Sequence, residues 1–245
     1  EPTLSIIIPA YNEEQRLPLT LDRLFASLSS HFTHLFEVVV ADDGSKDKTV
    51  EKVKDMAREH SNLRVLTFEK NSGRNAAVKD AVFATKAPFI LEMDADGSVD
   101  PEAIPRFFSY LAAHPEVDML IGARNIKGSK ITKKQPLLRV FLGNCFLFLM
   151  SIFFGWRMKD RVNGFKMFRR EAAADIFRRQ TLNYFLAEAE IVVIADRRGW
   201  VSRELPVMWA DNRDSRIRPL KEAIRSLKGI FEILWKDWKG EYRRD

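Results

Sequence analysis

Two aspartates one residue apart, Asp94 and Asp96, have the type and spacing of metal ligands. They come directly after an apolar run over residues 89–93, which has the character of a buried strand. Two carboxylates at a strand end can offer hard oxygens to one divalent cation, and Mg²⁺ or Mn²⁺ suits such a site when a diphosphate also binds the ion. Solvated turns often contain the same pattern, so its meaning depends on the residues placed beside it.

Other polar residues follow further apolar runs in the first half of the chain. These runs cover residues 4–8, 36–41, 63–68, 88–93 and 117–121. The polar segments after the first four are 9–13, 42–45, 71–74 and 94–98. Ligands of open parallel sheets bind beyond the carboxyl ends of the strands, so we expect these four segments to share one site. The glycine-rich loop of a P-loop or dinucleotide site is absent from the sequence, which disfavours an NTPase or a dehydrogenase.

Helical patterns separate the apolar runs. Four leucines recur at spacings of four, three and four, as on one helix face: Leu17, Leu21, Leu24 and Leu28. Segments 49–59 and 76–86 show the same periodicity, and Asp100 followed by Pro101 is a typical helix start. The alternation of strands and helices predicts an α/β fold with a mainly parallel, doubly wound sheet.

The second half contains two segments of a different kind. Residues 137–155 are almost continuously apolar and are interrupted by Arg139 and Asn144. This length is at the lower limit for crossing a bilayer, which favours an interfacial or re-entrant helix, with a buried core helix as the alternative. Residues 220–238 carry an apolar stripe with basic residues elsewhere, so this helix packs on the sheet or lies on a membrane surface.

Composition limits the class of protein. The 245 residues are 46% hydrophobic and 30% charged, as expected of one compact domain. The single cysteine, Cys145, excludes an internal disulfide and a cysteine zinc site. Residues 1–9 lack a basic stretch followed by an apolar signal core, so a cytoplasmic location is expected.

The net charge of +6 is unevenly distributed. Residues 120–180 hold fourteen Lys and Arg against three acidic residues, a net charge of +11, which leaves about −5 for the rest of the chain. Such a basic region indicates an anionic partner, whether nucleic acid, anionic lipid or a phosphate substrate.

Six motifs together carry a resemblance to a known family. They are PAYNEE at 9–14, DDGSKD at 42–47, DADG at 94–97, GAR at 122–124, NGFKMF at 163–168 and REAA at 170–173. With them the chain resembles the family 2 glycosyltransferases of the Rossmann-like GT-A fold. Within that family it is most similar to the polyprenyl-phosphate sugar transferases, in particular the dolichyl-phosphate β-glucosyltransferases. The resemblance covers nearly the whole chain.

The resemblance implies one GT-A domain over residues 1–245. Its nucleotide-sugar-binding half is 1–123, and its acceptor-binding and membrane-interface half is 124–245, with a C-terminal amphipathic helical part. The implied reaction is inverting transfer of a hexose, with UDP-glucose the favoured donor, to the phosphate of a membrane polyprenol such as dolichyl phosphate. The product would be a lipid-linked sugar donor for glycosylation, Mg²⁺ or Mn²⁺ the cofactor, and the location peripheral or monotopic on the cytoplasmic face of a membrane.

Family positions also imply roles for individual residues. The implied donor-binding residues are Pro9, Tyr11, Asn12, Glu13, Asp42, Asp43, Gly44, Asn71, Gly73, Arg74, Asp94, Ala95 and Asp96. Of these, Asp94 and Asp96 would bind the metal. The implied acceptor-binding residues are Arg124, Arg139, Asn163, Arg213, Ser215 and Arg216, and the guanidinium groups of Arg124 and Arg139 suit a phosphate.

Three further positions bear on catalysis and on the choice of sugar. Glu188 stands where the family has Asp near the anomeric centre and is expected to act in catalysis. Glu190 lies two residues further along the same helix, faces elsewhere, and is expected to be structural. Ser98 stands where the related mannosyl enzymes have Gln as a metal contact, which favours the glucosyl branch and leaves the third metal ligand open.

Three other functions compete with this interpretation. A dolichyl-phosphate mannosyltransferase would use GDP-mannose. A sugar-phosphate nucleotidyltransferase would share the nucleotide site and the metal pair, but it would not need the Phe-rich segment 141–154 or the 163–168 motif. A nucleic-acid-binding protein is disfavoured because the aromatic residues lie within the apolar run and are not interleaved with the basic ones, so no nucleic-acid partner is expected.

Overall fold

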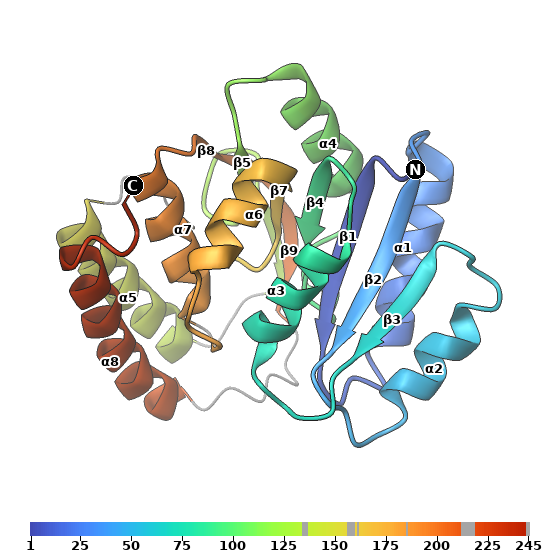
Figure 1. The fold of residues 1–245 in the computed structure, drawn as a ribbon, viewed down its shortest axis with the longest axis horizontal. Helices are drawn as coiled ribbons and strands as arrows, with labels where there is room; N and C mark the ends of the chain where they lie inside the picture. Colours follow the sequence, from blue (N-terminus) through green and yellow to red (C-terminus); the bar gives the residue numbers. More distant parts are fainter. Residues whose placement is uncertain (134–136, 156–159, 161, 185, 212–218, 244–245) are drawn as a thin grey trace.

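The computed structural model describes residues 1–133, 137–155, 160, 162–184, 186–211 and 219–243. In these ranges a seven-stranded sheet with the order β3-β2-β1-β4-β7-β5-β8 forms the centre of the molecule (Figure 1). Its strands are β1 (Leu4–Ala10), β2 (Phe36–Asp42), β3 (Leu63–Thr67), β4 (Phe89–Glu92), β5 (Met119–Ala123), β7 (Lys166–Arg169) and β8 (Ser202–Pro206). The five strands expected from the sequence all form, with ends shifted by at most two residues.

Helices cover both faces of this sheet, as a doubly wound fold requires. One face packs against α1 (Leu17–His31), α2 (Thr49–Met56) and α4 (Ala103–Ala113), and the other against α3 (Arg74–Ala84), α6 (Arg170–Arg179) and α7 (Ala187–Arg198). The alternation of β1 shows why: Leu4, Ile6 and Ile8 join the first core, while Ile7 joins the second. The four leucines of α1 are fully buried, which confirms the expected helix face.

Strand β7 is the antiparallel member of the sheet as described, and the sequence pattern did not reveal it. It lies between β4 and β5, and its register sets Lys166 opposite Glu92 and Phe168 opposite Ile90. The strand has four residues with charged residues at both ends, so it lacks the apolar run by which the other strands were recognised. Because β7 starts where β4 ends, residues 163–166 reach the edge at which the parallel strands end.

Two long helices, α5 (Leu137–Phe154) and α8 (Pro219–Trp238), pack against each other on the side of the sheet away from β3 (Figure 1). A small two-stranded sheet joins β6 (Lys130–Lys133) to β9 (Met208–Ala210). Both helices occur where the sequence predicted them. Among the described residues, no helix combines the length and the apolar character needed to cross a bilayer.

The expected apolar stripe of α8 is mainly its outer face. Ile230 and Ile233 pack into the core, whereas Phe231 and Trp238 are 66% and 75% exposed. Helix α5 is divided in the same way, with Met150 fully buried and Phe148 65% exposed. The alternative of an ordinary buried core helix for 137–155 is therefore wrong, because part of its apolar surface faces outward.

Candidate functional site

The loops after β1 and β2 are fastened to each other. Asn12 adopts a left-handed backbone conformation with φ of 56°, its N–H donates to Ser45 Oγ at 2.9 Å, and its Oδ1 accepts from Lys46 N–H at 2.8 Å. The Glu13 N–H donates to Thr49 Oγ1 at 2.8 Å, and Tyr11 is 36% exposed. These contacts hold segment 9–13 beside the loop after β2, and the partly exposed Tyr11 lies within that segment.

Asp42 and Asp43 end β2 and have different partners. The Asp43 carboxylate accepts from Ser72 N–H at 2.7 Å and Gly73 N–H at 2.9 Å, while its burial raises its pKa. Asp42 Oδ2 accepts from Ser45 N–H at 3.1 Å, and Asp42 Oδ1 is buried with no hydrogen-bond partner in the described structure. Buried polar atoms normally have partners, so Asp42 Oδ1 is an unused hydrogen-bond acceptor at the end of β2.

Glycines let the loop before α3 approach its neighbours closely. Gly73 has φ of 101°, and a Cβ at this position would lie 2.3 Å from Asn183 O. Gly44 has φ of 74° and backs onto Asn71, where a Cβ would lie 3.1 Å from the Asn71 nitrogen. Both positions need glycine, which fixes the path of the backbone that leads to Arg74.

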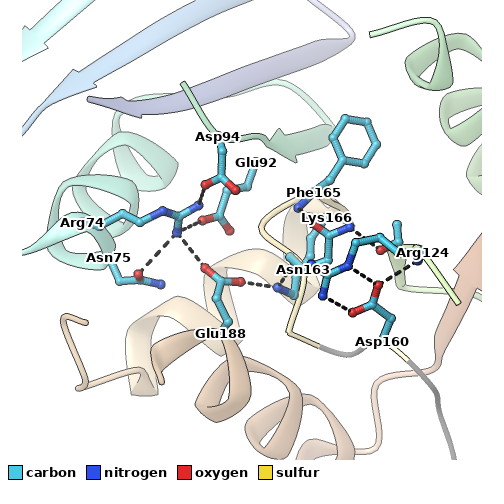
Figure 2. Close-up of polar contacts among 11 residues, drawn as sticks. Arg74, Asn75, Glu92, Asp94, Arg124, Asp160, Asn163, Phe165, Lys166 and Glu188 are labelled. Atoms are coloured by element: carbon cyan, nitrogen blue, oxygen red, sulfur yellow. Dashed lines mark hydrogen bonds and ion pairs between the residues drawn. The ribbon is translucent and has the colours of Figure 1, made fainter. Parts of the chain in front are cut away.

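Five charged residues meet beyond the end of β4 (Figure 2). We call the group Arg74, Glu92, Asp94, Lys166 and Glu188 the charged cluster. Arg74 Nη1 donates to Glu92 Oε1 and to Glu188 Oε1, each at 2.6 Å, and Arg74 Nη2 donates to Asp94 Oδ1 at 2.6 Å. Lys166 is fully buried, and its ammonium donates to Glu188 Oε2 and to Asn163 O. Residues from α3, β4, β7 and α7 are thus joined in one network.

The carboxylates of this cluster are not equivalent. For Glu188, burial works against ionisation, but Lys166 and Arg74 outweigh it and lower the pKa. For Glu92, burial and the charge of Glu188 raise the pKa from 4.5 to about 7, and Glu92 Oε2 is buried with no partner among the described residues. The pKa values differ because Glu188 has direct hydrogen bonds from both Lys166 and Arg74, whereas Glu92 has a direct hydrogen bond from Arg74 and feels Lys166 only at a distance.

Asp94 and Asp96 lie at the open side of the cluster. The Asp94 side chain is 42% exposed, and a Cβ at Gly164 would lie only 2.5 Å from Asp94 Oδ2. Burial and the charge of Asp94 raise the pKa of Asp96, which also accepts from Ser98 N–H at 2.9 Å. The two carboxylates therefore interact, as neighbouring ligands of one cation would.

The charge balance indicates which ion this place can hold. When all are ionised, the carboxylates Glu92, Asp94, Asp96 and Glu188 face the cations Arg74 and Lys166, so two negative charges stay uncompensated. One divalent cation carries that charge. The parts of the chain with described positions contain no group of three His, Cys, Asp or Glu side chains that could hold a metal. The carboxylates of Asp94 and Asp96 are hard oxygen donors, which fit Mg²⁺ or Mn²⁺.

Arg124 is paired inside the protein. Its Nε and Nη2 donate to the buried Asp160 at 2.7 and 2.6 Å, and its guanidinium lies 5.3 Å from the centre of the Trp209 ring. Burial lowers the pKa of Arg124, but Asp160 and then Asp94 outweigh it, and the net pKa is raised. While this pair is intact, a phosphate has only the remaining N–H groups of Arg124 available. The sequence did not anticipate Asp160 as a partner.

The other predicted acceptor residues are placed less directly. Asn163 is buried, and its amide donates to Gly122 O at 2.5 Å, which ties β5 to the start of β7. Arg139 lies on α5, but its side chain is outside the described part of the structure. Arg213, Ser215 and Arg216 also lie outside the described residues. The acceptor roles of these residues stay predictions.

The remaining predicted donor residues form the frame of the site. Pro9 pairs with Ala41 in the β1–β2 register, and Ala95 O accepts from Thr20 Oγ1 at 2.8 Å. Glu190 is fully buried and turned away from the cluster. Its carboxylate accepts from the Thr181 N–H and hydroxyl, the Leu182 N–H and the Tyr242 hydroxyl, which bears out its expected structural role.

Sequence reasoning missed three buried charged residues: Glu92, Asp160 and Lys166. Glu92 had a visible signal, since it is the single charge within the apolar run 89–93. Lys166 was noted only as part of a motif, because nothing in a lone lysine shows that it will be buried.

The chain is similar in sequence to proteins named as dolichyl-phosphate beta-glucosyltransferases. Dolichyl-phosphate beta-glucosyltransferase ALG5C of Trichomonas vaginalis is 33% identical over 222 residues, covering 87% of this chain and 66% of that protein. The mouse dolichyl-phosphate beta-glucosyltransferase is 29% identical over 250 residues, covering 98% and 77%. The chain thus spans about two thirds to three quarters of these relatives' lengths.

A solved structure supports the same fold. Glucosyl-3-phosphoglycerate synthase from Mycobacterium tuberculosis, in complex with Mn²⁺, UDP-glucose and phosphoglyceric acid, has a TM-score of 0.64 at 18% identity, covering 95% of this chain and 80% of that one. At this identity the match establishes the α/β fold of glycosyltransferases. The family model described as glycosyl transferase family 2 matches residues 5–177, which is well over half of the chain. The chain therefore belongs to glycosyl transferase family 2.

Proposed function

We propose that this chain transfers glucose from UDP-glucose to the phosphate of dolichyl phosphate, with inversion at the anomeric carbon. The observation that carries this proposal is the charged cluster at the carboxyl end of β4 together with Asp96, in which Asp94 is open to a ligand and two negative charges are uncompensated when all four carboxylates are ionised. The names of the relatives, dolichyl-phosphate beta-glucosyltransferases, supply the sugar and the acceptor.

The donor would lie across the ends of β1, β2 and β4. Asp42 Oδ1 offers the nucleoside a buried acceptor, and Tyr11 offers it an exposed ring. Asp94 and Asp96 would hold Mg²⁺ or Mn²⁺, which when bound offsets the charge that develops on the leaving diphosphate. Arg74 keeps Asp94 oriented for this ligand from the inner side.

The acceptor phosphate is the nucleophile. It is anionic at neutral pH, so its oxygen can form the new bond to the anomeric carbon without a general base. The bond from that carbon to the diphosphate breaks with its electron pair on UDP, and attack from the opposite face inverts the centre. Positioning is then the main requirement, and Arg124, Arg139, Asn163 and the 213–216 segment are the groups we assign to it.

The chain would reach this lipid from the membrane surface, as a peripheral or monotopic protein on the cytoplasmic face. Exposed apolar side chains on the outer faces of α5 and α8 support this: Val140, Phe148, Ile152, Phe153, Leu227, Phe231, Trp235 and Trp238. Drawing a polyprenyl tail into water costs about 0.8 kcal/mol per CH₂, so the enzyme must come to the phosphate. Lys127, Lys130, Lys133 and Lys134 precede α5 and add attraction to anionic lipid.

Vesicle co-sedimentation tests the membrane part of the proposal. Phe231→Glu should reduce binding to vesicles that contain anionic lipid, and high salt should weaken wild-type binding without abolishing it. Leu35→Glu is the matched control, because Leu35 is 67% exposed on the connection between α1 and β2. Equal loss in both variants, or no wild-type binding at all, would contradict this orientation.

A donor panel tests the reaction itself. Purified protein with Mn²⁺ and a short polyprenyl phosphate is incubated separately with UDP-glucose, GDP-mannose and UDP-N-acetylglucosamine, and the lipid product is followed. We expect glucosyl lipid from UDP-glucose and little product from the other donors. Product from GDP-mannose alone would indicate a mannosyltransferase. A separate incubation contains UTP and glucose 1-phosphate. Formation of UDP-glucose there, with no lipid product in the donor panel, would indicate a nucleotidyltransferase.

A further inference from the structure

Lys166 has no role in the reaction as described above, yet it is one of the fully buried charges of the site. It is fully buried at the start of β7, opposite Glu92 in the sheet register. An ammonium group is costly to remove from water unless charged and polar partners surround it. Lys166 meets that condition with two acceptors, Glu188 Oε2 and Asn163 O.

The first of these contacts leads to the metal carboxylate through charged hydrogen bonds. Lys166 donates to Glu188 Oε2, and the other oxygen, Glu188 Oε1, accepts from Arg74 Nη1 at 2.6 Å. Arg74 then extends Nη2 to Asp94 Oδ1 at 2.6 Å. Figure 2 shows this sequence of side chains running from Lys166 through Glu188 and Arg74 to Asp94.

The second contact leads to the same carboxylate through the backbone. The Asn163 carbonyl, held by Lys166, is followed by Gly164, which packs against Asp94 and Arg74. A Cβ at residue 164 would lie 2.5 Å from Asp94 Oδ2 and 2.9 Å from Arg74 Nη2. The buried Lys166 ammonium therefore contacts both structures that lie against Asp94: the Glu188–Arg74 pair on one side and the loop at Gly164 on the other.

We propose that Lys166 is a positioning residue for the metal end of the active site, acting through Glu188 and Arg74 on Asp94. This inference rests on the proposed function. Without Lys166, Glu188 Oε2 loses its donor, the Glu188 contact to Arg74 is held less firmly among the three carboxylates that Arg74 reaches, and Asp94 is held less well for the cation. The opposing view is that Lys166 only neutralises a buried charge and serves stability.

Lys166→Met tests this, since Met has similar length and no charge. We expect kcat to fall about tenfold or more and the Mn²⁺ concentration for half-maximal activity to rise about fivefold, the scale of lost support behind metal ligands. Calorimetric UDP binding titrated with Mn²⁺ should show the same shift without turnover. Phe168→Leu, two residues along β7 in the core, is the control and should lower stability alone.

A double-mutant comparison distinguishes the two views even when Lys166→Met folds poorly. Glu188→Gln leaves the buried Lys166 ammonium without its carboxylate, whereas Lys166→Met/Glu188→Gln removes both charges, so the buried contact is neutral as a whole, as it is in the wild type. If Lys166 acts through Glu188, both proteins share the same Mn²⁺ dependence and kcat within about twofold. A further tenfold loss in the double variant, or a folded Lys166→Met protein with wild-type kcat and Mn²⁺ dependence, overturns the proposal.

The outcome is separable from that of the proposed function. Wild-type protein that fails to bind UDP in the presence of Mn²⁺ would refute the nucleotide-sugar site. Wild-type protein that binds UDP with Mn²⁺, while Lys166→Met binds identically, would refute the role of Lys166 alone.

Discussion

Helix α7 carries two buried glutamates, two residues apart, whose surroundings differ in kind. Glu188 contacts two cations, Lys166 and Arg74, and shares Arg74 with two other carboxylates. Glu190 contacts uncharged donors alone among the hydrogen bonds described here. We call Thr181, Leu182, Glu190 and Tyr242 the neutral-donor cluster, and its hydrogen bonds measure 2.7 to 3.0 Å.

The two clusters differ in whether their own residues satisfy every buried carboxylate oxygen. The neutral-donor cluster is closed, because four donors satisfy both oxygens of Glu190 and tie α7 to the C-terminal Tyr242. The charged cluster is left unbalanced: Glu92 Oε2 has no partner within the described structure, and the pKa of Glu92 is raised to about 7. Such imbalance is stable where a ligand brings the missing charge, which is typical of active sites.

The largest effect should come from the open end of the charged cluster. Asp94→Asn removes one carboxylate charge from the metal position, as does Asp96→Asn, and kcat should fall about 100-fold or more, the scale of a lost electrostatic contact to the transition state. The melting temperature should stay the same or rise, because repulsion with Glu92 and Asp96 is relieved. Steady-state kinetics and calorimetry measure both. Glu102→Gln, an exposed acid nearby, is the control, and near wild-type turnover in folded Asp94→Asn would remove Asp94 from the metal site.

Glu188→Gln is the next test, and it addresses α7 directly. The amide keeps the shape but loses the charge that Lys166 and Arg74 contact, so we expect a 10- to 100-fold loss of kcat. The free energy of unfolding should also fall, because the fully buried Lys166 loses its carboxylate partner and relief of the repulsion with Glu92 compensates only part of that loss. Activity equal to wild type would mean that the two glutamates do not differ in the way proposed.

Glu190→Gln should lower the stability of the protein without lowering kcat. Its amide nitrogen would face donors, two hydrogen bonds would be lost, and the free energy of unfolding should fall by about 2 to 3 kcal/mol. Tyr242→Phe removes one donor of the same cluster and should cost about 1 kcal/mol. Urea unfolding measures both, and kcat per folded molecule should equal wild type. A selective loss of kcat in Glu190→Gln would instead extend the active site across α7.

Sequence patterns were sufficient for the parts of the fold that repeat. The leucine spacing of α1 and the apolar runs of β1 to β5 predicted their elements, because burial imposes a period that can be read locally. Strand β7 escaped because it has four residues, and its pairing between β4 and β5 depends on contacts far apart in the chain.

The same reasoning explains which site residues were found. Asp42, Asp94 and Asp96 stand at strand ends, where topology alone predicts a ligand site. Glu92 and Lys166 meet only because antiparallel β7 sets them opposite each other, and Arg124 meets Asp160 across 36 residues. Pairings of this kind are three-dimensional facts that residue types and spacing do not encode.

The last expected effect is on stability alone and concerns the pH dependence that Glu92 gives to the charged cluster. Burial and Glu188 raise the pKa of Glu92 to about 7 in the folded protein, against an ordinary value of 4.5. Between these pH values the unfolded chain loses this proton and the folded protein keeps it, so the contribution of Glu92 to stability declines as pH rises and is fully lost above about pH 7.

Glu92→Gln removes that loss. Relative to wild type, the variant should gain about 1 to 3 kcal/mol of unfolding free energy between pH 5 and pH 8, and little beyond, since both states of Glu92 are then ionised. Other carboxyls with raised pKa, Asp43 and Asp96, are present in both proteins and cancel in the difference. Urea unfolding at each pH measures the gain, with Glu102→Gln, a substitution of an exposed acid, as the control. A difference that stays constant from pH 5 to pH 8 would mean that Glu92 is ionised throughout, and the charged cluster would then be balanced without a ligand, as the neutral-donor cluster is.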